Sequence, residues 1–67
     1  MLDGTDIKNR RKALGWSRRD LAIRSDTDPR VMQLLELGHS NDEDAAARVE
    51  RALSAAETAM GLDGPPN

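Results

Sequence analysis

Apolar residues along the chain recur at helical spacing, and short polar segments with helix-capping residues separate them. No segment shows the alternation of apolar and polar residues, with a period of two, that is typical of a strand. We expect four helices, at about residues 4–14, 17–25, 28–37 and 41–60. The expected fold class is therefore all-α. We expect one compact four-helix domain over residues 1–61, with a long fourth helix, and a flexible tail at residues 62–67.

Capping residues indicate where these helices begin. Ser17 opens the segment Ser-Arg-Arg-Asp, which has the spacing of a capping box. Asp28 followed by Pro29 is a strong start signal, because the carboxylate caps the helix and proline needs no N–H at the first position. Ser40 and Glu43 repeat the capping-box spacing and predict the start of the fourth helix there.

The composition excludes several kinds of chemistry. A chain of 67 residues forms a single small core, and without cysteine it has neither a disulfide nor a thiolate metal site. No glycine-rich phosphate loop, catalytic pair or metal-ligand spacing occurs, so we expect no enzyme, no metal and no cofactor. No apolar stretch is long enough for a bilayer and no signal peptide is evident, so the expected location is cytoplasmic.

Charge is divided unevenly along the chain, although the net charge is only −2. Residues 7–24 carry seven basic residues and one acid, a local charge of +6. Residues 34–67 carry two basic residues and seven acids, a local charge of −5. Because the basic residues are gathered at one end, an acidic overall balance is compatible with binding to nucleic acid.

The two middle helices are short, and a polar turn separates them in which Asp26 tolerates a left-handed backbone. Residues 7–38, IKNRRKALGWSRRDLAIRSDTDPRVMQLLELG, resemble the Cro and lambda-repressor type of helix-turn-helix family, including its xenobiotic-response-element regulators. The matching positions are Ile7, Arg11, Gly15, Trp16, Ser17, Leu21, Ala22, Glu36 and Gly38. The resemblance implies a lambda-repressor-like fold. It also implies a Cro-like or repressor-like transcriptional regulator, of a kind that phages encode, which binds double-stranded DNA in a sequence-specific manner.

The resemblance also implies that the helix at 28–37 enters the major groove. Arg30 can form a bidentate contact with guanine, Gln33 can contact adenine, and Leu34 can touch a thymine methyl group. Arg18 is expected at the DNA backbone, whereas for Arg10 and Arg19 a solvent-exposed face is an equal alternative. The full set expected to bind DNA is Ser17, Arg18, Arg19, Asp28, Pro29, Arg30, Gln33, Leu34, His39 and Ser40.

Arg11 and Glu36 stand where the family has a structural arginine–glutamate pair, so the resemblance implies an ion pair that joins two helices. The chain departs from the family at Arg10, where a core leucine is common. It also departs at residues 26–28, where Asp-Thr-Asp replaces the usual Gly-Val-Ser turn. The second departure places two carboxylates near the backbone of any bound DNA.

Apolar residues outside the core pattern suggest protein partners. Ile23 and Leu37 either form an exposed patch with Leu34 or pack under the fourth helix, and both interpretations stay open. The alternative function is a protein interaction module, such as an antirepressor, that binds its partner through this patch. Leu53, Ala56 and Met60 share one helix face and predict the interface of a homodimer, which sets two recognition helices about 34 Å apart.

Overall fold

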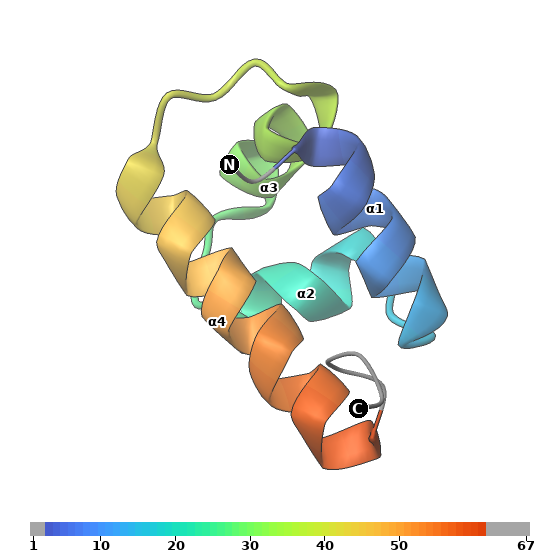
Figure 1. The fold of residues 1–67 in the computed structure, drawn as a ribbon. Coiled ribbons are helices and arrows are strands. Elements are labelled where there is room, and N and C mark those ends of the chain that lie inside the picture. Colours follow the sequence, from blue (N-terminus) through green and yellow to red (C-terminus); the bar gives the residue numbers. More distant parts are fainter. Residues whose placement is uncertain (1–2, 62–67) are drawn as a thin grey trace.

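The computed structural model describes residues 3–61, which form four α-helices joined by short loops (Figure 1). Helix α1 spans Gly4–Ala13, α2 spans Arg18–Arg24, α3 spans Pro29–Leu37 and α4 spans Glu43–Met60. No strand occurs among residues 3–61, so the expected all-α class with four helices is confirmed. The tail expected at residues 62–67 lies outside the described residues. None of these four helices combines the length and the apolar composition needed to cross a bilayer.

The start of α2, the start of α3 and the turn between them follow the sequence pattern. The Ser17 hydroxyl accepts a hydrogen bond from the Asp20 N–H at 3.0 Å, and the Asp20 carboxylate accepts one from the Ser17 N–H at 3.0 Å. The Asp28 carboxylate caps α3 by accepting from the Arg30 N–H at 2.8 Å. Between the two helices, Asp26 has a left-handed φ of 53°. These local hydrogen bonds therefore fix where both short helices begin.

Helix α4 begins later than the sequence pattern predicts. Its N-cap is Asp42, whose carboxylate accepts from the Ala45 N–H at 2.9 Å. The Ser40 hydroxyl accepts instead from the Asp42 N–H at 3.1 Å, outside the helix. The capping box expected of Ser40 and Glu43 is therefore wrong, because an ionised carboxylate two residues further on is the stronger acceptor.

The core takes side chains from all four helices. In Figure 1, α2 lies across the middle of the molecule between α1 and α4. Trp16, the sole aromatic residue of the chain, packs partly buried against the core. The buried apolar residues are Ile7, Leu14, Leu21, Ala22, Met32, Leu35, Ala45, Val49 and Leu53.

The first turn of α1 is pressed against the last turn of α3 at Gly4. A Cβ atom at this position would lie 2.4 Å from the carbonyl oxygen of Glu36 and 2.5 Å from that of Leu35. Both atoms belong to the backbone and cannot move aside as a flexible side chain does. Glycine is therefore required here for α1 to approach α3 this closely.

The three α4 residues expected at a homodimer interface do not form one exposed surface. Leu53 is fully buried inside the chain, so the expectation that it faces a second subunit is wrong. Ala56 is half-buried against the same core, and of the three residues only Met60 is exposed, at 56%. The helical spacing of these residues is the same whether the helix packs within its own domain or against another, so the pattern did not separate the two cases.

Helix α1 reaches the second half of α4 through Arg10. The Arg10 guanidinium donates to the Glu50 carboxylate at 2.7 and 3.0 Å and to the Glu57 carboxylate at 2.6 and 2.8 Å. It also donates to the Ser54 hydroxyl at 3.3 Å and lies 3.5 Å from Asp6. Arg10 therefore belongs neither to a solvated face nor to a DNA-binding one, because it ties two helices together.

These contacts change the titration of both partners. Hydrogen bonds from Arg10 lower the pKa of the Glu50 carboxyl below its usual value, and those to Glu57 and Glu50 raise the pKa of Arg10. A carboxyl whose pKa is lower in the folded state contributes stability above its unfolded pKa and loses it as the pH falls through the folded pKa. The link between α1 and α4 is therefore strongest at neutral pH and weakens in acid.

We expect Arg10→Met to lower the free energy of unfolding at neutral pH by about 1–2 kcal/mol, because solvent screens a pair whose glutamate is 42% exposed. The difference from the wild type should shrink in acid, as the pH falls through the lowered pKa of the Glu50 carboxyl. Urea unfolding of both proteins between about pH 7 and pH 3 measures this difference in the free energy of unfolding. Lys12→Met, at an exposed position of the same helix, is the matched control and should change stability by less than about 0.5 kcal/mol. A difference that stays constant with pH would contradict the role of the carboxylates.

Candidate nucleic-acid interface

The N-terminal ends of α2 and α3 meet at a shallow groove on the surface, which we call the arginine groove. It is lined by Arg18, Arg19, Pro29, Arg30 and Gln33. All five residues are exposed, and all five belong to the set that the sequence predicts to bind DNA. Two separate helices therefore contribute residues of their N-terminal halves to one basic depression.

The other expected DNA-binding residues lie outside the arginine groove. Ser17 and Asp28 are the N-caps of α2 and α3, and their side-chain oxygens accept hydrogen bonds from the backbone of their own helices. Leu34 is exposed on α3. His39 and Ser40 follow the C-terminal end of α3, at the opposite end of that helix from the groove.

The exposed face of α3 changes character along its length. Arg30, Gln33, Leu34 and Leu37 are exposed and share one face, because their spacing is three, four and seven residues from Arg30. The polar pair lies at the start of the helix and the two leucines at its end, where Leu34 is 43% and Leu37 57% exposed. Helix α3 therefore presents a polar half followed by an apolar half.

The exposure of Ile23 on α2 and Leu37 on α3 decides between the two interpretations of these residues. Ile23 is 70% exposed and Leu37 is also exposed, so the interpretation that they pack under α4 is wrong. Ile23 lines a small depression beside the turn, together with Asp26 and Pro29. Leu37 lies instead at the C-terminal end of α3, so the two residues belong to different parts of the surface.

The ion pair expected between Arg11 and Glu36 is present under the arginine groove. Arg11 Nε donates to Glu36 Oε2 at 2.7 Å and Arg11 Nη2 donates to Oε1 at 3.2 Å. The two side chains are only 9% and 5% exposed. Arg11 Nη1 also donates to the Trp16 carbonyl oxygen at 3.0 Å. A single arginine therefore holds α1, the loop after it and α3 in place.

Two contacts of the exposed arginines are not predicted by the sequence. Arg18 Nε lies 3.7 Å from Glu36 Oε1, so the buried carboxylate faces a second arginine. The Arg24 guanidinium lies over the Trp16 ring, 4.6 Å from its centre, in a cation–π contact. Both contacts hold α2 on the rest of the fold. Each joins residues that do not share a helix, so no spacing rule could have found them.

Two carboxylates stand next in sequence to residues that line the arginine groove. The N–H and the hydroxyl of Ser17 lower the pKa of Asp20, so this side chain stays ionised at neutral pH. Asp28 stands at the start of α3, directly before two residues that line the groove. Three arginines against these two acids leave the groove basic. Its guanidinium groups can bind phosphate oxygens or base edges, and its lining residues include no nucleophile.

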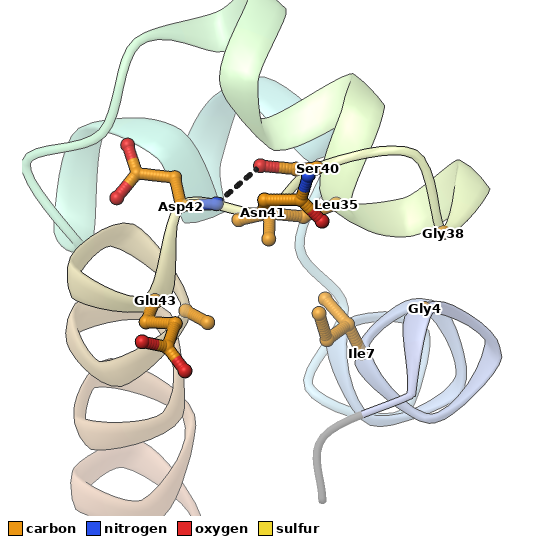
Figure 2. Close-up of a pocket in the computed structure, with 9 residues that line it drawn as sticks. Gly4, Ile7, Leu35, Gly38, Ser40, Asn41, Asp42 and Glu43 are labelled. Carbon is orange, nitrogen blue, oxygen red and sulfur yellow. Dashed lines mark hydrogen bonds between the residues drawn. The ribbon is translucent and has the colours of Figure 1, made fainter.

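A larger depression lies at the other end of α3 (Figure 2). Its apolar wall includes Ile7 and Leu35, and its rim includes Asp42 and Glu43 at the start of α4. An acidic rim repels nucleic acid. No group of three or more His, Asp or Glu side chains suited to a metal ion is found in residues 3–61. The arginine groove is therefore the candidate site for a polyanion.

No protein-family model, curated protein or solved structure matches this chain. The resemblance to the Cro and lambda-repressor type therefore stays an expectation, and the geometry of the arginine groove is the observation that bears on function.

We expect Arg11→Lys to lower the free energy of unfolding by about 2–4 kcal/mol, because an ammonium group cannot replace the bidentate pair and the bond to the Trp16 carbonyl together. Thermal or urea unfolding measures this loss. The same substitution at the exposed Arg19 is the matched control, with an expected change within about 0.5 kcal/mol. Similar small changes at both positions would show that the buried pair does not stabilise the fold.

Proposed function

We propose that the protein is a sequence-specific regulator of transcription that binds double-stranded DNA, of the Cro or lambda-repressor type, with α3 in the major groove. The observation that carries this proposal is the arginine groove at the N-terminal ends of α2 and α3. Three guanidinium groups from the first turns of two helices line it, and guanidinium groups favour phosphate. The packing of α2 and α3 around a four-residue turn, Ser25 to Asp28, agrees with a helix-turn-helix pair.

The dimensions of α3 suit this role. A helix with its side chains is about 10–12 Å across, and the major groove of B-DNA is about 12 Å wide. Arg30 and Gln33 on its exposed face can contact purine edges, and Leu34 can contact the methyl group of thymine. Arg18 and Arg19 at the start of α2 can bind the phosphates that flank the groove.

A homodimer is part of the proposal, because two copies of α3 about 34 Å apart would contact a palindromic operator. Of the residues expected at the dimer interface, the exposed Met60 is the one that can still serve there. The stoichiometry of protein to duplex at saturation tests this point.

A second candidate function is a protein interaction module such as an antirepressor. The observation that favours it is the exposure of Leu34 and Leu37 on the second half of the α3 face. Exposed apolar side chains that lie together often mark a protein interface. If the protein is such an interaction module, it should show no saturable binding to duplex DNA.

We expect saturable binding to duplex DNA, whose association constant falls linearly on logarithmic axes as the salt concentration rises. Arg18→Ala and Arg19→Ala should each weaken binding to all sequences and reduce the salt slope by about one, because each removes a phosphate contact. Titrations at three salt concentrations with competitor DNA measure both effects. Arg51→Ala, which removes an exposed charge from α4, is the control and should leave the slope unchanged. Failure of the wild type to bind at low salt would overturn the proposal and favour the second function.

We expect Arg30→Ala to relax the base preference at one position of the half-site by about 1–3 kcal/mol of discrimination, because a bidentate contact with guanine is lost. Selection from a randomised duplex library by the wild type and by the variant measures the preference at every position. The Arg51→Ala variant should select the same sequences as the wild type. An unchanged profile for Arg30→Ala would exclude the docking of α3 by this face.

A further inference from the structure

The Glu36 carboxylate faces two arginines. Its oxygens accept from Arg11 at 2.7 and 3.2 Å, and Oε1 also lies 3.7 Å from Arg18 Nε. The Glu36 side chain is buried, and Arg11, itself buried, holds it from one side. Because a carboxylate fixed in this way cannot turn toward solvent, it presents a negative charge of constant position to Arg18.

Arg18 stands between this carboxylate and the arginine groove. Its side chain is half-exposed and lines the groove. The nitrogen nearest to Glu36 is Nε, and at 3.7 Å the contact is an ion pair and not a hydrogen bond. Within residues 3–61 no nitrogen of the Arg18 guanidinium donates a hydrogen bond. The end of the guanidinium group that reaches furthest from the backbone is therefore open to a ligand.

Arg19 provides a natural comparison. It lines the same groove and is exposed like Arg18, yet it forms no ion pair with any acid of residues 3–61. A contact with the buried carboxylate thus distinguishes Arg18 from Arg19.

We propose that Glu36 is a positioning residue for DNA binding, whose fixed charge attracts the Nε side of the Arg18 guanidinium, so that both terminal NH2 groups meet a phosphate oxygen with less further ordering. This inference rests on the proposed function. A free arginine side chain loses rotamer freedom when it binds phosphate, and Arg18 has lost part of that freedom already. Glu36 belongs to α3 and Arg18 to α2, so the same contact sets the phosphate ligand in register with the helix that enters the major groove.

The carboxylate also has an opposing effect. A negative charge beside the groove weakens the long-range attraction of DNA, and it does so whichever basic residue stands at positions 18 and 19. The positioning effect requires a cation at position 18 that faces the carboxylate with one nitrogen and the ligand with two others, which only arginine provides. A comparison of arginine with lysine, which keeps the charge but has no Nε–H in that place, therefore separates the two effects.

The test is a cycle of variants measured by titration of the full chain into duplex DNA. Arg18→Lys should weaken binding about five- to tenfold, while Arg19→Lys should change it by no more than about twofold. In the Glu36→Gln background, the loss of affinity from Arg18→Lys should shrink to about twofold. Without the Glu36 charge, neither arginine nor lysine at position 18 is positioned, so the two side chains differ less. The loss from Arg19→Lys should stay as it was.

A second measurement needs no DNA and no variant of Glu36, whose loss can weaken the fold. Nitrogen-15 relaxation of the arginine Nε–H groups in the free wild type should give Arg18 a higher order parameter than Arg19, which we expect below about 0.6. Equal order parameters would overturn the inference that Glu36 holds Arg18.

The outcomes distinguish this inference from the function on which it rests. Equal losses for Arg18→Lys and Arg19→Lys would overturn the positioning role while leaving DNA binding intact. The positioning role is also overturned if Arg18→Lys costs as much with Glu36→Gln as without it. Absence of DNA binding by the wild type would overturn the proposed function, and the positioning role would fall with it.

Discussion

The buried pair of Arg11 and Glu36 is the interaction on which the arrangement of the helices depends. Burial of two charges is unfavourable unless their hydrogen bonds are made, and here Arg11 makes three, two to Glu36 and one to the Trp16 carbonyl. The pair joins α1 to α3 beside the point where Gly4 allows their backbones to touch. Together with the buried Met32 and Leu35, this contact sets the orientation of α3 and the face that it presents.

The same contact explains how the basic residues are divided between structure and surface. Arg10 and Arg11 are neighbours with the same charge, yet both are engaged inside the fold, one with α4 and the other with α3. The α4 acids that form ion pairs with Arg10 account for part of the negative charge of the second half of the chain. The cations at the arginine groove are therefore Arg18, Arg19 and Arg30, and the local charge of residues 7–24 overstates what a polyanion meets.

The sequence predicted the helices and caps well, because a cap depends on residues two or three positions apart. It failed at Ser40, where a stronger acceptor stands two residues on, and at Leu53, where helical spacing does not tell an internal core from an interface. It also missed the partners of Arg10, which lie 40 and 47 residues away. Glu50, Ser54 and Glu57 share a helix face, and that spacing is a signal that could have found the site for a partly buried cation.

The mixed character of the α3 face bears on the choice between the two candidate functions. A protein partner that covered this face and the α2 side of the arginine groove would have to supply acids for the three arginines there and apolar side chains for Leu34 and Leu37. Unpaired charges at a desolvated interface are costly. A DNA duplex offers both kinds of group in a fixed order, because phosphates line the edges of the major groove and thymine methyl groups lie on its floor. The combination of three arginines with two leucines therefore favours a duplex over a protein as the ligand.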